Sequence, residues 1–115
     1  MAAKLIESSF TNKRDIARVT TRQDAQPLKT VATGTEFEYT GYVVQEITNE
    51  LTGEVFESIL IAAADGQVYA TRSESFIRGL KEILDICEGD DEPIILRINR
   101  STSRNGREFV SCSLV

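Results

Sequence analysis

The sequence contains no histidine and no tryptophan, and only two cysteines among its 115 residues. Without histidine, the chain lacks the commonest general base and the commonest metal ligand in proteins. Two cysteines alone cannot supply the four ligands of a structural zinc site. We therefore expect no metal or cofactor. We also expect Cys87 and Cys112 to be small buried hydrophobic residues and not a disulfide.

Long hydrophobic segments are also missing from the chain. No part of it approaches the roughly 20 apolar residues that cross a bilayer as a helix. The first residues, Met1 to Lys4, lack the apolar core of a signal peptide. These absences favour a soluble, cytoplasmic protein with no membrane partner. A chain of 115 residues is long enough to form one domain around its own core.

The formal net charge of −5, taken alone, argues against a nucleic-acid partner. The charges are, however, unevenly distributed. Residues 1–35 carry six basic and three acidic residues, 36–93 carry three and fourteen, and 94–115 carry four and one. The middle segment therefore has a net charge of −11, whereas each end has a net charge of +3. A local basic surface is compatible with this acidic total.

The first 26 residues are polar and weakly patterned, so we expect a basic N-terminal arm at 1–26 and a folded domain at 27–115. Within the arm, Ile16 and Val19 allow one or two helical turns from about Asn12. Leu28 and Val31 have the spacing of one further helical turn, at the start of the domain.

Alternation of apolar and polar residues predicts three strands, at 36–47, 54–64 and 67–72. Gly41, inside the first strand, indicates a bulge or a sharp bend. The segment 49–53 has the composition of a turn. Asp65-Gly66, between the second and third strands, is typical of a type I′ hairpin turn, which needs positive φ at both central residues.

The periodicity then changes from that of a strand to that of a helix. A helix is predicted from Ser73 or Ser75, each a good N-cap, to Cys87, with Gly89 just beyond its end. Its apolar stripe consists of Phe76, Leu80, Ile83, Leu84 and Cys87. Two more strands are predicted at 94–99 and 108–115, joined by the polar loop 101–106.

Three antiparallel strands, one helix and two more strands follow one another in this prediction. That order is typical of the OB-fold, so we predict a mainly β protein: a five-stranded Greek-key barrel with one α-helix between strands three and four. A long first strand with a central glycine suits this barrel, because that strand must curl to join both halves. A small split β-barrel and an open α+β sheet remain as alternatives.

The loop after the fourth predicted strand is rich in basic residues and is the main candidate for a ligand-binding loop. In OB-folds this loop and the face of strands two and three form the usual binding site. Four arginines lie within the eleven residues 97–107, mixed with asparagine and small hydroxyl residues, a composition that suits contacts with phosphates. The candidate basic residues, with one more at the end of the third strand, are Arg72, Arg97, Arg100, Arg104 and Arg107.

Flat side chains are the second requirement of single-strand binding, because bases stack on them. Tyr69 should point to the opposite face of its strand from Val68 and Ala70. Core packing is the alternative role for each ring. The candidate stacking residues are Tyr42, Phe56, Tyr69 and Phe109.

Three segments of this sequence resemble a known family. They are 63–69 (AADGQVY) with the helix that follows it, 102–111 (TSRNGREFVS), and 28–31 (LKTV). In these segments the chain resembles the single-stranded DNA-binding proteins of small protein-primed bacteriophages and related phages, over about residues 27–115. The resemblance implies an OB-like fold, coating of exposed single strands during replication in the host cytoplasm, and no catalytic activity. It also implies roles for Tyr69 and for the turn from Thr102 to Phe109. The acidic tail with which cellular single-strand binders recruit partners is not expected here.

Two functions of different classes compete. The leading hypothesis is a non-catalytic module that binds single-stranded DNA with little sequence preference, with replication proteins as possible further partners. The alternative is an OB-like protein-interaction module that uses its acidic middle region. An enzyme is not supported, because the sequence offers no histidine, no phosphate-binding glycine loop and no nucleophile motif.

Overall fold

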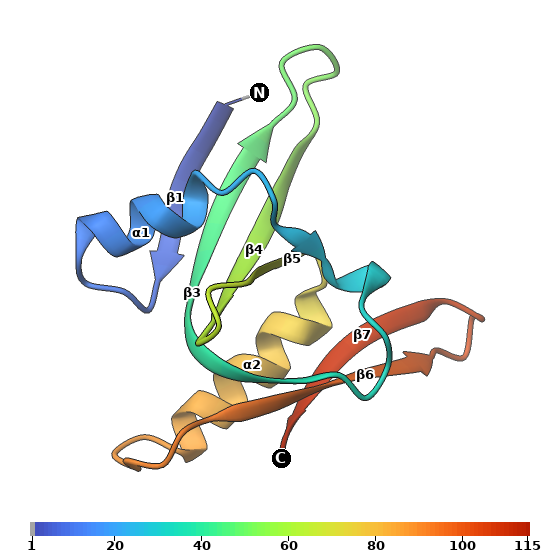
Figure 1. Cartoon of the computed structure of the whole chain (residues 1–115). Coiled ribbons are helices and arrows are strands. Elements are labelled where there is room, and N and C mark those ends of the chain that lie inside the picture. The colour runs from blue at the N-terminus through green and yellow to red at the C-terminus, as the bar shows by residue number, and fades with distance from the viewer. Residues whose placement is uncertain (1) are drawn as a thin grey trace.

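A computed structural model describes residues 2–115 and shows one curled, mixed sheet with two α-helices. The sheet forms a half-barrel, drawn in Figure 1. Its elements, in chain order, are β1 (Ala2–Ser8), α1 (Lys13–Thr20), β2 (Gln26–Pro27), the 3₁₀ turn η1 (Leu28–Thr30), β3 (Glu36–Thr48), β4 (Val55–Ala63), β5 (Val68–Thr71), α2 (Glu74–Ile86), β6 (Ile95–Thr102) and β7 (Glu108–Leu114).

The five predicted strands and the predicted helix are confirmed as β3 to β7 and α2. The sheet nevertheless has seven strands in place of five, because β1 pairs with β3 and β2 runs parallel to β5. The two additional strands carried no pattern that predicts them. β2 is only two residues long, and β1 has adjacent exposed residues, Leu5 and Ile6, where alternation would be needed.

The thirteen-residue strand β3 connects the two halves of the half-barrel. Its start, Glu36 to Glu38, pairs with β6, and the rest pairs with β4. The register shifts between Tyr39 and Gly41, which confirms the predicted bulge. A Cβ atom on Gly41 would lie 2.2 Å from Cζ of Phe10, so glycine allows the N-terminal segment to pack directly on the bent strand.

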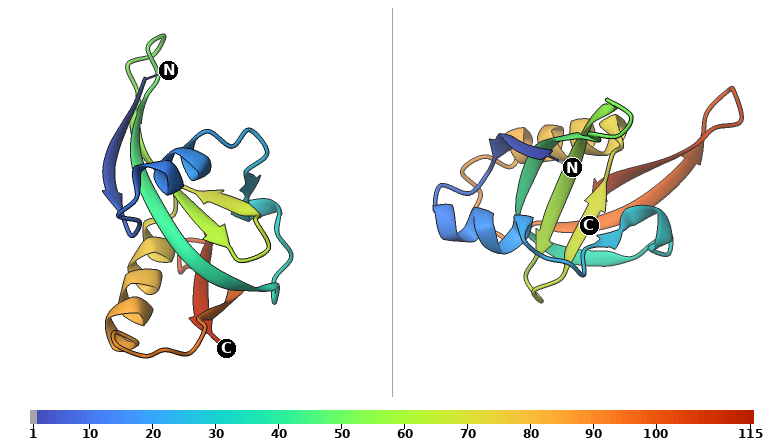
Figure 2. Two further views of the ribbon diagram at one scale, coloured as in Figure 1. Left: turned by 60° about the vertical axis from the view of Figure 1, so that its left-hand side comes forward. Right: turned by 90° about the horizontal axis from the view of Figure 1, so that it is seen from above.

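The sheet segment β3–β5 has two covered faces. Its inner face carries the main core, which α2 closes with the fully buried Phe76 and Leu80. Its outer face, defined by Val43, Leu60 and Val68, is partly covered by α1. Figure 2 shows α1 and α2 on opposite sides of these strands. The register set by β3–β5 therefore decides which side chains face the core and which face outward.

The hairpin between β4 and β5 is confirmed, but the predicted type I′ turn is wrong. Gly66 has a φ of +90°, whereas no other residue type has positive φ within residues 2–115. The Gly66 N–H donates to the Ala63 carbonyl over 3.0 Å, and the Ala63 N–H donates to the Gln67 carbonyl over 2.9 Å. This pattern is a three-residue loop, a type I turn followed by a left-handed glycine, which needs only one positive φ.

The N-terminal residues form more structure than the sequence indicated. The predicted helical turns near Asn12 are confirmed as α1, where the Asn12 side chain accepts a hydrogen bond from the Arg14 N–H over 2.8 Å. The Glu7 carboxylate links β1 to the rest of the molecule, because it accepts from the Tyr42 hydroxyl at 2.8 Å and from Lys81 of α2 at 2.6 Å. Neither helix of residues 2–115 is long and apolar enough to cross a membrane.

Candidate nucleic-acid interface

The outer face of β4 and β5 is covered at one end and open at the other. Residues alternate along β4, so Phe56 and Ser58 point to the same face as Leu60, which contacts the α1 side. Arg72 follows the end of β5, and its guanidinium reaches the Phe56 ring on that face. α1 stops short of this end, so the two side chains stay accessible.

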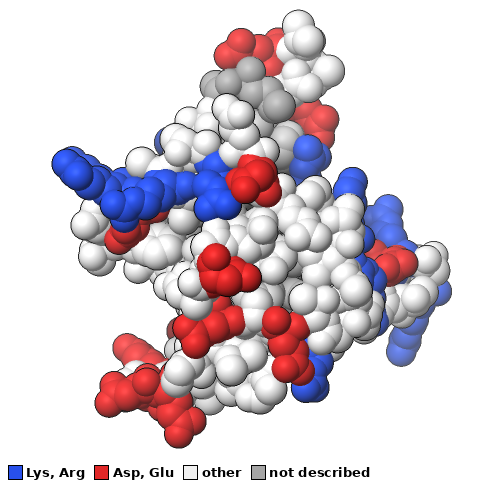
Figure 3. All heavy atoms as spheres, in the orientation of Figure 1, with Lys and Arg blue, Asp and Glu red and all other residues white. Residues whose placement is uncertain are grey.

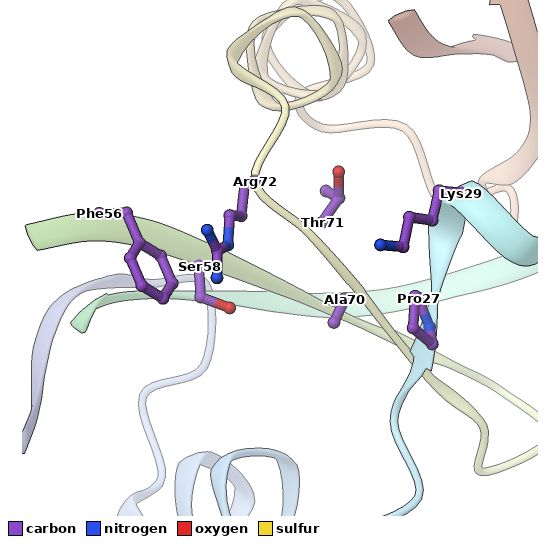
Figure 4. A pocket seen from close by; sticks show the side chains of 7 residues that line it. All are labelled: Pro27, Lys29, Phe56, Ser58, Ala70, Thr71 and Arg72. Carbon is purple, nitrogen blue, oxygen red and sulfur yellow. The ribbon is translucent and has the colours of Figure 1, made fainter. Parts of the chain in front are cut away.

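A cavity of about 520 Å³ lies at this open end and is called here the Phe56 pocket. The 3₁₀ turn η1 forms one wall and contributes Lys29, whose side chain reaches toward the same space as Arg72 in Figure 4. The pocket thus combines one aromatic ring with two cations and small neutral side chains. Its lining residues are Pro27, Lys29, Phe56, Ser58, Ala70, Thr71 and Arg72.

The contact between Arg72 and Phe56 is the most specific feature of the pocket. The guanidinium carbon lies 3.4 Å from the centre of the ring, so the two planar groups are in direct cation–π contact. A guanidinium placed on a ring keeps its N–H groups free to contact phosphate, and both planar groups can stack with a base. The pair can therefore contact the base and the phosphate of one nucleotide at the same time.

A second basic surface lies on the hairpin between β6 and β7. Its tip, Ser103 to Arg107, is called here the arginine turn, and it repeats the three-residue loop of the β4–β5 hairpin with Gly106 at φ +77°. The side chains of Arg104 and Arg107 are exposed and have no hydrogen bond or ion pair among the described residues. Phe109 follows on the outward face of β7 and is 36% exposed.

Arg97 and Arg100, by contrast, have partners within the protein. Arg97 is bound to the Glu36 carboxylate, with the shorter N···O distance at 2.6 Å. Arg100 donates to the Leu28 and Lys29 carbonyls at 2.9 and 3.0 Å. It also donates to the Thr33 hydroxyl at 2.9 Å and pairs with Glu108. Arg100 therefore fastens η1, with the pocket residue Lys29, to β6.

One family model matches this chain over residues 10–115, and its family is described as phage single-stranded DNA-binding protein of the phi29 type. The chain belongs to this family. The match covers α1, the Phe56 pocket and the arginine turn, and it confirms the resemblance found in the sequence. No curated protein and no solved structure matches the chain. Membership of the family implies that the protein binds phage single-stranded DNA.

Two of the aromatic candidates for contact with single-stranded DNA are buried in this family member. Tyr69 points away from Val68 and Ala70, as predicted, but that face is the core. Its ring is 7% exposed and lies with its centre 4.6 Å from that of Phe37. Tyr42 is 8% exposed, and burial together with the hydrogen bond to Glu7 raises the pKa of its hydroxyl. Their burial argues against base stacking by either ring in this conformation.

The sequence-derived candidates thus fall into three groups. Phe56 and Arg72 meet in the pocket, Arg104, Arg107 and Phe109 lie on or beside the arginine turn, and the others are buried or bound internally. Lys29, which lines the pocket, is not among the candidates derived from the sequence. It is the polar residue in a turn whose apolar members, Leu28 and Val31, are buried, and this pattern alone would have placed it on the surface.

Charge is also segregated on the surface of this phage DNA-binding protein. Figure 3 shows Lys and Arg gathered over α1 and along the β6–β7 side of one face. Asp and Glu gather elsewhere in the same view, notably over the loop between α2 and β6, which contains Glu88, Asp90, Asp91 and Glu92. Single acidic residues, such as Asp15 and Glu108, also lie beside the basic groups, so the separation of the two signs is partial.

Proposed function

We propose that this protein coats single-stranded DNA with little sequence preference, and that it protects exposed strands during phage DNA replication. The observation that carries the proposal is the contact of Arg72 with Phe56 in an open pocket that also holds Lys29. Rings bind bases of any identity and cations bind phosphates, so neither contact depends on base sequence.

The arginine turn forms the second part of the proposed binding surface. Arg104 and Arg107 have no internal partners among residues 2–115, so their charges are available to phosphates, and Phe109 offers a partly exposed ring beside them. The residues of the Phe56 pocket and of the arginine turn lie within 27–115, the part of the chain that the sequence analysis expects to be the binding domain.

We also propose that β3 to β7 and α2 are the five strands and the helix of an OB-type barrel, to which β1 and β2 are additions. Four antiparallel ladders support this assignment: β3–β4, β4–β5, β3–β6 and β6–β7. OB-folds bind oligonucleotides on strands two and three and on the loops after strands one and four. Here those strands are β4 and β5, which carry the Phe56 pocket, and the loop after strand four is the arginine turn.

The proposed role requires no chemical step. The protein would act by occupying the strand in the cytoplasm of the host cell, and replication proteins would meet it on the DNA. Binding through phosphates predicts that affinity falls with salt, by a log–log slope of about −0.7 for each phosphate neutralised on a single strand.

Arg72→Gln tests the proposal most simply, with fluorescence anisotropy of a labelled oligo-dT as the measurement. The substitution removes one cation from the pocket, so we expect weaker binding and a salt slope smaller by about 0.7. Arg78→Gln is the matched control, because Arg78 is an exposed arginine on α2 and its loss changes the net charge equally. Equal effects of the two substitutions would show that only overall charge matters and would remove the pocket from the proposal.

A protein-interaction role has one observation in its favour. Glu46, Glu57 and Glu74 line a second cavity of about 460 Å³, which shares Phe56 and Arg72 with the Phe56 pocket. Glu46 and Glu57 are direct cross-strand partners in β3 and β4, where two like charges are unfavourable. If this surface binds a basic protein, Glu57→Gln should weaken that complex and leave oligo-dT affinity unchanged. A complex with a basic protein that Glu57→Gln does not weaken would exclude this second role.

A further inference from the structure

Helix α1 places basic side chains on its exposed side. Ile16 and Val19 pack toward the outer face of β3–β5, and Val19 is buried. Lys13, Arg14 and Arg18 lie on the solvent side of the same helix and are all exposed. The exposed side of α1 is therefore a compact group of three cations, which the basic composition of the N-terminal arm alone could not show.

Two of these charges, on Lys13 and Arg14, do not stabilise the helix that carries them, whereas Arg18 lies in the last turn, where positive charge is favourable. Lys13 and Arg14 occupy the first helical turn, where positive charge opposes the helix dipole. Arg14 and Arg18 stand four residues apart, a spacing at which like charges repel. Asp15 offsets part of this repulsion through its ion pair with Arg18 at 2.8 Å. Lys13 and Arg14 have no ion pair among the described residues, so their charge is left for an external anion.

The position of α1 links this group to the proposed DNA-binding surface. α1 lies on the outer face of β3–β5, the face that carries the Phe56 pocket at its open end. A single strand of DNA that leaves the pocket toward α1 therefore stays on one face of the sheet and need not pass around its edge. In Figure 3 the basic atoms over α1 and those along the β6–β7 side lie toward opposite edges of one view, on either side of β3–β5.

We propose that the exposed side of α1, with Lys13, Arg14 and Arg18, is a further phosphate-contacting surface, beside the arginine turn, for the single-stranded DNA bound at the Phe56 pocket. This inference rests on the proposed function. Arg14 and Arg18 are one turn apart, about 6 Å along the helix axis, so they offer successive contacts to an extended backbone. α1 thus lengthens the stretch of DNA that one molecule occupies, whereas the pocket alone binds a short strand.

The double variant Lys13→Gln/Arg14→Gln tests this inference with oligo-dT of two lengths. One oligonucleotide has about 6 nucleotides and fills the pocket, and the other has about 16, near the upper limit for one OB-fold. The variant should bind the short oligonucleotide like the wild type. With the long one, its log–log salt slope should be smaller by about 1.4, so that wild-type affinity falls about sevenfold more than variant affinity between 50 and 200 mM salt.

Lys4→Gln/Arg78→Gln is the matched control, because it removes two exposed basic residues that lie on β1 and α2. Far-ultraviolet circular dichroism of both variants confirms that the fold is intact. If the control changes the long-oligonucleotide slope as much as the α1 variant does, or if the α1 variant keeps the wild-type slope, the inference is overturned. A wild-type protein that binds neither oligonucleotide at low salt would instead overturn the proposed function itself.

Discussion

Gly41 offers the sharpest test of how the N-terminal segment packs on the sheet. A Cβ atom at this position would meet Cζ of Phe10 at 2.2 Å and the two Cε atoms at 2.5 and 2.7 Å. The backbone of Gly41 is not in the left-handed region, so alanine adds a steric conflict without backbone strain. Overpacking of this kind costs typically 1–3 kcal/mol, so Gly41→Ala should lower the free energy of unfolding by about that amount.

Urea denaturation measures this change as a lower midpoint with an unaltered slope m. The reasoning predicts strong coupling with Phe10: in a Phe10→Ala background, Gly41→Ala should cost almost nothing, because the ring that it displaces is gone. Gly79→Ala is the matched control. A Cβ there meets only the Cys112 carbonyl, at 3.8 Å, so alanine in α2 should stabilise the protein by up to about 1 kcal/mol. Additive costs of Gly41→Ala and Phe10→Ala would refute the packing argument.

Two further predictions concern charged residues. Arg100→Ala should lower the free energy of unfolding by about 2–3 kcal/mol, because it removes charged hydrogen bonds to η1 and Thr33. Arg104→Ala should change the free energy of unfolding by less than about 0.5 kcal/mol, and it should reduce the salt slope of oligo-dT binding. The hydrogen bond from Lys81, followed by that from Tyr42, lowers the pKa of Glu7 below its usual 4.5, so the stability that it contributes is present above pH 4.5 and lost as the pH falls below that value. Urea denaturation at a series of pH values should therefore show Glu7→Gln less stable than wild type at pH 6 by about 0.2–1 kcal/mol, as for exposed pairs, with the difference shrinking as the pH falls below 4.5.

The sequence was most informative where one pattern ran over many residues. The apolar stripe of α2 and the alternation in β3 and β4 each repeat several times, so these three elements could be predicted. The bulge in β3 could be predicted from Gly41. Strand β1 could not be predicted, because it is an edge strand that pairs on one side only. Leu5 and Ile6 are both exposed there, so the strand needs no alternation of apolar and polar residues. The hairpin at Asp65-Gly66 was predictable, but its turn type was not, because Asp-Gly suits both a type I′ turn and a three-residue loop in which only the glycine has positive φ.

The candidate site shows the same limit at the level of single side chains. Alternation gave the direction of Tyr69 relative to Val68, yet only the packing of the two helices decides that this direction is the core. The cluster of arginines was visible in the sequence, but the partners that remove Arg100 from the surface lie more than sixty residues away in the chain. Contacts of such separation depend on the fold and leave no local pattern.

The central claim is that the Phe56 pocket contacts single-stranded DNA directly. Because the chain contains no tryptophan, Phe56→Trp places a single indole in the pocket beside Arg72 and gives a local fluorescence probe. Titration with oligo-dT at low salt should change the indole emission in proportion to binding measured by anisotropy of the labelled oligonucleotide, because bases stack on the ring. Anisotropy that reports binding while the indole emission stays constant would contradict the claim.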